Sequence, residues 1–240
     1  IIFYASCFNK ETKNPDRTLD LLDRAMATAE LAGKNAVDRN DVLDNFSVNN
    51  EILNNTPENV KIALAAHEAG HFLVHHFSSE LSNFKTTALS IMPAEDYYGA
   101  HVYEIDNNVI PSRTLNYYIQ YIACSLGGRI AEKLFSSELS AGASADLKKA
   151  TDLAKVVVTQ YALVDTFSDK RVYLNDKDSA PLIRENVYRI DNEIDNLLNK
   201  AEMCAKYIFK HHRKELNLLV DTLLERKMLS AEELDELFAE

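Results

Sequence analysis

Hydrophobic and polar positions along this 240-residue chain follow mainly a helical period, with apolar residues three and four positions apart. The pattern predicts helices over 18–33, 39–46, 57–77, 115–135, 144–163, 182–212 and 216–227. A final helix is expected after Ser230, because the run Ser-Ala-Glu-Glu that it begins is a capping box. The last third of the chain, about 181–240, is therefore predicted to be a wholly helical C-terminal region.

Two short segments break the helical period. Residues 86–92 (TTALSIM) and 100–105 (AHVYEI) are typical of β-strands, and the connection PAEDYYG between them favours a hairpin. The predicted fold class is mainly α with a small β-sheet.

An Asn-rich stretch, SVNNEILNNTPEN, is polar and predicts a linker with a domain boundary near residue 50. The predicted domains are therefore 1–50 and 51–240. After the linker, Thr56 is suited to be the N-cap of the next helix and Pro57 to its first turn. No further proline follows before about Phe77, so the run HEAGH lies late in one long helix.

Two glycines, Gly127 and Gly128, lie inside the predicted helix 115–135. Each costs about 1 kcal/mol relative to alanine in an exposed helix. We therefore expect this helix to pack closely against a neighbouring element at these positions.

Charge and cysteine content exclude some classes of function. The net charge is −11 and the pI is about 5.1, which argues against a nucleic-acid-binding surface. Three cysteines, far apart in sequence and without a CxxC pair, indicate free thiols in a reducing compartment. The same spacing argues against a thiolate zinc site.

The run HEAGHFLVHH contains four of the seven histidines of the chain. His67 and His71 are four residues apart, so on a helix both imidazoles face the same side and can bind one zinc ion. Glu68 is placed beside such an ion, where a carboxylate can take a proton from a water molecule. H-E-x-x-H on a helix is the metalloprotease signature for this reason, and the pattern predicts a zinc site.

A third ligand has to come from elsewhere. His75 lies eight residues beyond the first histidine, ~12 Å along a helix axis, and cannot reach the same ion. His75 and His76 are therefore predicted to be a surface pair or one that supports the ligands indirectly. By position alone the candidates are Glu132, Asp146 and Asp152, and Asp146 ranks first because it lies in a first helical turn after a Gly-Ala-Ser loop. An aspartate there also commonly just complements the helix dipole.

Three motifs, HEAGH, LGGRIAE and GASADLKKAT, resemble in order and spacing the peptidase domain of the FtsH family, the membrane-anchored AAA+ zinc proteases. The resemblance extends over about 57–240. It implies Zn²⁺ bound by His67, His71 and Asp146, with Glu68 as the general base. It also implies that one strand forms the edge of the cleft, beside which an extended substrate would lie. The residues of that strand are Ala88, Leu89, Ser90, Ile91 and Met92.

The family also works as a homohexameric ring in which an ATPase module feeds substrates to the peptidase. The chain has no G-x-x-x-x-G-K-[ST] motif, so ATP would act only through a module outside it. Residues 1–50 resemble the last helices of an AAA+ lid, and membrane association would depend on a segment outside this chain. The site rim departs from the family pattern in a short acidic loop (EIDNN), in the missing Gly-Pro of LVDTFSDK and at Ala145.

The predicted function is a zinc metalloendopeptidase that degrades unfolded or membrane-extracted proteins. One alternative is a catalytically silent, ring-forming scaffold of an AAA+ protease complex. Another is a structural zinc site, which would have four protein ligands rather than three and an open position.

Overall fold

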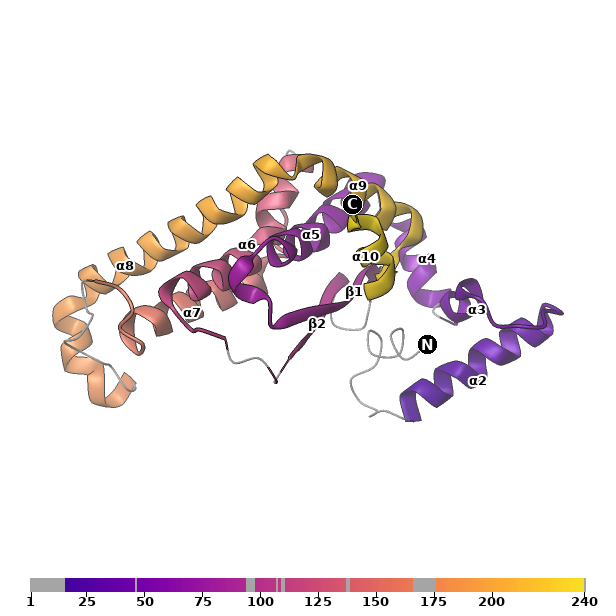
Figure 1. Ribbon diagram of the computed structural model, residues 1–240, viewed down its shortest axis with the longest axis horizontal. Helices are drawn as coiled ribbons and strands as arrows, with labels where there is room; N and C mark the ends of the chain where they lie inside the picture. The colour runs from indigo at the N-terminus through magenta and orange to yellow at the C-terminus, as the bar shows by residue number, and fades with distance from the viewer. Residues whose placement is uncertain are drawn as a thin grey trace.

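The computed structural model describes residues 16–45, 47–93, 98–106, 108, 111–136, 139–165 and 176–239. The middle of the predicted hairpin connection (94–97) and much of the polar segment before the C-terminal helices (166–175) lie outside these ranges. Figure 1 shows α8 extending along one side of the molecule, while α2 and α3 lie at the opposite end. None of the described helices is both long and apolar enough to cross a lipid bilayer.

The described part of the chain is mainly helical, as predicted. Its helices are α2 (Asp16–Leu31), α3 (Arg39–Asp44), α4 (Ser47–Asn55), α5 (Glu58–His76), the 3₁₀ turn η1 (Ser79–Leu81), α6 (Leu115–Phe135), α7 (Ser144–Thr159), α8 (Asp176–His211), α9 (Arg213–Arg226) and α10 (Ala231–Phe238). The strands are β1 (Phe84–Pro93), β2 (Tyr98–Ile105) and β3 (Met228–Ser230). The fold class, mainly α with a small sheet, is confirmed.

The three strands form one antiparallel sheet in the order β2-β1-β3. The hairpin of β1 and β2 follows the sequence pattern, whereas β3 has only three residues and shows no strand pattern of its own. It pairs with β1 through Ala88 opposite Ser230 and Ser90 opposite Met228. β1 is therefore the central strand, with a neighbour on each side.

α5 and α6 pack against each other at their glycines, as the sequence predicted. A Cβ atom added at Gly70 of α5 would lie 2.5 Å from the carbonyl oxygen of Gly127, and one added at Gly127 would lie 2.7 Å from that of Gly70. Only hydrogen fits between the two backbones. This close approach brings α6 beside the histidines of α5.

Two local predictions are wrong. The stretch expected to be a linker contains the helix α4, in which Leu53 is 2% exposed and belongs to the main hydrophobic core. Thr56 does not cap α5: its hydroxyl donates back to the carbonyl oxygen of Ile52, and the N-cap position is occupied by Pro57. Burial of one leucine thus outweighs the polar composition around it.

The capping box before the last helix is confirmed. Ser230 Oγ accepts from the backbone N–H of Glu233, and the Glu233 carboxylate accepts from that of Ser230. Lys227 has a left-handed conformation with φ 64°, which ends α9 and turns the chain into β3. The C-terminal helices are thereby tied to the sheet.

Candidate metal centre

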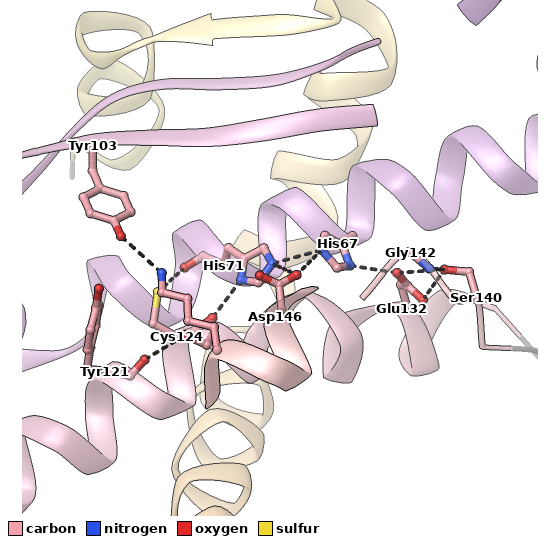
Figure 2. Close-up of polar contacts among 11 residues, drawn as sticks. His67, His71, Tyr103, Tyr121, Cys124, Glu132, Ser140, Gly142 and Asp146 are labelled. Carbon is pink, nitrogen blue, oxygen red and sulfur yellow. Dashed lines mark hydrogen bonds and ion pairs between the residues drawn. The ribbon is translucent and has the colours of Figure 1, made fainter. Parts of the chain in front are cut away.

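Three side chains from two helices converge beside the sheet. His67 and His71 project from successive turns of α5, and Asp146 projects from the first turn of α7 (Figure 2). His67 Nε2 lies 2.9 Å from His71 Nε2 and 3.2 Å from Asp146 Oδ2, and His71 Nε2 lies 3.4 Å from that oxygen. Donors bound tetrahedrally to zinc at ~2.0–2.1 Å are about 3.3 Å apart, so these separations fit one zinc ion.

Hydrogen bonds on the far side of both rings fix their tautomers. His71 Nδ1 lies 2.7 Å from the carbonyl oxygen of Cys124, which can only accept, so Nδ1 carries the hydrogen. His67 Nδ1 lies 2.7 Å from Glu132 Oε1 and donates to that carboxylate in the same way. Both Nε2 lone pairs therefore face each other at 2.9 Å, an arrangement that needs a cation between them. The donor set fits a metal ion.

Of the three acidic candidates from the sequence, the structure brings Asp146 into the group. The ligand atoms of His67, His71 and Asp146 all lie within 4.8 Å of one another. Asp152, further along α7, is exposed and pairs with Lys148 instead. The first turn of α7 faces α5, which explains why Asp146 and not Asp152 joins the two histidines.

Glu132, which the sequence offered as a candidate third metal ligand, does not belong to the three-residue group. Its side chain lies on α6, is 4% exposed, and contacts the outer nitrogen of His67 rather than the inner one. Ser140 Oγ donates to the same carboxylate at 3.3 Å. A carboxylate in this position orients the ring and raises the basicity of the ligating nitrogen. The motif LGGRIAE contains the residue, but only the packing of α6 on α5 reveals the contact.

Glu68 is buried between the three-residue group and β2. Burial raises the pKa of its carboxyl group to about 7, and the nearby His71 and His67 oppose the shift. Its carboxylate accepts from the backbone N–H of His101. A Cβ atom added at Gly99, where φ is +90°, would lie 2.9 Å from Glu68 Oε1. The glycine thus allows β2 to pass directly over the carboxylate.

The charges around the group favour a cation. Burial alone would lower the pKa of His67, but its bonds to Asp146 and Glu132 raise it to about 10. Burial alone would raise the pKa of Asp146, but hydrogen bonds from His67 and His71 hold it well below its usual value. The His67 imidazole therefore holds a second proton at neutral pH in the metal-free group, and a metal ion can replace that proton.

Part of the strand that was expected to border the cleft has a neighbouring strand on each side. The residues assigned to it, Ala88, Leu89, Ser90, Ile91 and Met92, are all buried. They belong to the central strand β1, whose backbone pairs with β2 on one side and β3 on the other. Ala88, Leu89 and Ser90 have a partner strand on each side, so an added strand has no free edge to pair with at these three residues. Contact of the segment with substrate stays a prediction. The sheet edge nearest Glu68 belongs to β2.

His75 and His76 do not join the metal group, as the helix geometry predicted. His75 is not a surface residue: it is 7% exposed, and its Nδ1 lies 3.1 Å from Thr86 Oγ1. That hydroxyl also lies 2.9 Å from His101 Nε2. Burial lowers the pKa of His75 to about 4, so the ring is neutral at pH 7. His76 is exposed.

Comparison with known proteins agrees with this geometry. The model of peptidase family M41 matches residues 55–237. The ATP-dependent zinc metalloprotease FtsH of Syntrophotalea carbinolica is 32% identical over 186 residues, which cover 73% of this chain and 28% of that protein. The ATP-dependent zinc metalloprotease YME1L1 of Mus musculus is 31% identical over 176 residues, covering 72% of this chain and 24% of that protein.

A third relative, the ATP-dependent zinc metalloprotease FtsH of Ruminiclostridium cellulolyticum, is 29% identical over 191 residues, 75% of this chain and 30% of that protein. The chain thus spans less than a third of the length of these relatives. The family match covers most of the chain and includes all of the motifs on which the resemblance rested. The chain therefore belongs to peptidase family M41, as an FtsH-family zinc metalloprotease peptidase domain.

Proposed function

We propose that this chain is a zinc-dependent endopeptidase in which His67, His71 and Asp146 bind the ion and Glu68 is the general base. The observation that carries the proposal is the convergence of three ligand atoms within 4.8 Å beside a buried carboxylate. Among the described residues the group has three members, which leaves a coordination position for water or substrate, as catalytic zinc sites require. That count favours the catalytic function over a structural zinc site.

When bound, zinc supplies Lewis-acid polarisation of the scissile carbonyl and lowers the pKa of a water molecule. Glu68 accepts a proton from that water and delivers it to the leaving amine. The N–H of His101 holds the carboxylate in place. Glu132 and the Cys124 carbonyl keep the two histidines in the tautomer that exposes Nε2.

The substrate, in this proposal, is an extended polypeptide that adds to the outer edge of β2. β2 is an edge strand of the sheet, and its Gly99 lies against the Glu68 carboxylate, so the unpaired edge of β2 lies close to the metal group. Pairing of this kind tolerates many sequences, since main-chain hydrogen bonds supply much of the affinity. It suits the degradation of unfolded or membrane-extracted proteins.

The assembly is also a proposal. We infer that the chain acts in a homohexamer fed by an AAA+ ATPase module outside this sequence, with residues 1–50 as the end of its lid. The relatives named above are ATP-dependent, and this chain covers less than a third of each. Light scattering on the purified chain would measure whether it forms a hexamer without that module.

The test of the function is zinc content and cleavage of unfolded casein by wild type, Glu68→Gln and Asp146→Ala. Glu68→Gln should retain zinc and lose cleavage, because it removes the proton acceptor but no ligand. Asp146→Ala should lose both. The matched control is Asp152→Ala on the same helix, which should retain both, since Asp152 is exposed and forms an ion pair with Lys148. Full cleavage by Glu68→Gln would refute the mechanism, and a wild type that binds zinc but never cleaves would favour the scaffold.

A further inference from the structure

A lysine and two tyrosines lie together at one end of the metal group. Lys149 is one helical turn after Asp146 on α7, and its Nζ lies 3.5 Å from Tyr103 Oη of β2 and 5.2 Å from the ring centroid of Tyr121 on α6. Figure 2 shows both tyrosines on the His71 side of the group, opposite Glu132 and Ser140. Three separate elements therefore contribute to this lysine–tyrosine cluster.

The ammonium group of Lys149 has no carboxylate partner among the residues that the structure describes, whereas the adjacent Lys148 pairs with Asp152. An ammonium offers three donors, and the hydrogen bond to Tyr103 is at the outer limit of length. Partial burial alone would lower the pKa of Lys149, but the phenols of Tyr103 and Tyr121 raise it above its usual value. The Lys149 ammonium is thus a charged, solvent-accessible group beside the metal group that can donate further hydrogen bonds.

The position of the cluster along β2 relates it to the substrate. Gly99 and His101 contact Glu68, and Tyr103 follows two residues later on the same face of the strand, ~7 Å further on. A peptide that adds antiparallel to β2 runs in the opposite direction. Its residues over Tyr103 are therefore those that precede the scissile bond.

We propose that Lys149, with the Tyr103 hydroxyl, selects an acidic side chain among the residues that precede the scissile bond. The inference rests on the proposed function and adds a substrate preference to it. A carboxylate there would accept from the ammonium and from the phenol, which are the donors that the cluster presents. Lys149 is in this view a specificity residue and takes no part in the proton transfer.

The test uses the zinc-loaded 240-residue chain and peptides whose cut bond has first been mapped. Each peptide is made in pairs with Glu or Gln at one of the two positions before the bond, or at one of the two positions after it. We expect wild type to favour Glu over Gln before the bond by about five- to tenfold in kcat/KM, the range between an exposed ion pair and a charge-assisted hydrogen bond. The preference should shrink between 50 mM and 500 mM KCl.

Lys149→Met should reduce that preference to less than twofold, through a lower kcat/KM for the Glu peptides. Lys149→Glu should reverse it, and Tyr103→Phe should reduce it in part. Lys148→Met is the matched control and should cleave both members of each pair as wild type does. Equal rates for Glu and Gln peptides in wild type would overturn the proposal. So would a preference confined to positions after the bond, or an equal loss for both peptides in Lys149→Met.

Binding separates this inference from the proposed function. Fluorescence anisotropy with the same labelled peptides and the zinc-loaded Glu68→Gln variant measures affinity without cleavage. If wild type cleaves neither peptide, a Glu preference in binding that Lys149→Met abolishes would sustain the inference while the proposed function fails. Equal binding of Glu and Gln peptides would overturn the inference whether or not cleavage occurs.

Discussion

Replacing Gly128 by alanine should weaken zinc binding about 10- to 100-fold without unfolding the protein, although Gly128 is not a ligand. A Cβ atom at this position on α6 would lie 2.5 Å from His71 Nε2 and 2.8 Å from His67 Cδ2 and Cε1. These separations are 0.6–0.9 Å shorter than 3.4 Å, the lower limit of ordinary van der Waals contact, so both imidazoles have to move by about that much.

Neither ring can move freely. His67 Nδ1 is bonded to Glu132 and His71 Nδ1 to the Cys124 carbonyl, so a shift that makes room for the methyl group weakens these bonds. Zinc ligand distances tolerate about ±0.2 Å, several times less than the required displacement. The loss of affinity should therefore be of the size seen when the partners of metal ligands are changed.

The assay is a competition titration against a chromogenic chelator, together with urea unfolding of the metal-free protein. In a helix interior alanine is about 1 kcal/mol more favourable than glycine, and this gain offsets the cost of displacing the two imidazoles. The metal-free Gly128→Ala variant should therefore unfold with a free energy close to that of wild type. Gly127→Ala gives the contrast: its Cβ atom would lie 2.7 Å from the Gly70 carbonyl oxygen, and overpacking should lower stability by about 1–3 kcal/mol. If Gly128→Ala binds zinc within twofold of wild type, the reasoning is refuted.

Three further predictions concern other parts of the molecule. The pKa of His75 is about 4 in the folded state and ~6.5 in the unfolded state. Between pH 6.5 and pH 4 the unfolded state therefore binds more protons, and the free energy of unfolding decreases as the pH is lowered. Wild type should lose about 2 kcal/mol more than His75→Gln between pH 7 and pH 4.5 in urea unfolding, and equal slopes would contradict this. Glu132→Gln should reduce zinc affinity about tenfold with a normal fold, because the amide is a poorer acceptor for His67 Nδ1–H, and an unchanged chelator titration would argue against that role. Ser230→Ala should cost about 1 kcal/mol in thermal unfolding by removing the cap of α10, with Ser144→Ala as a control in a helix where no side-chain cap is formed.

The sequence by itself determined the features that depend on local geometry. Helix boundaries from α5 to α7 follow the apolar spacing closely, and the pairing of His67 with His71 needs only the pitch of one helix. Asp146 could be ranked first from its place in a first helical turn, and the resemblance to a family supported that ranking. The close packing at Gly127 was likewise expected, because an unfavourable residue inside a helix needs a reason from outside it.

Only the tertiary structure decided the features that depend on distant parts of the chain. β3 pairs with β1 across about 140 residues, which makes β1 central and moves the free edge to β2. Glu132 lies 65 residues from His67 and supports it because α6 packs on α5, a contact with no signal in either segment. Sheet order and helix packing are set by burial of apolar surface over the whole domain, while a helix is set by its neighbours along the chain. The opposition of Lys149 and Tyr103, from α7 and β2, arises in the same way.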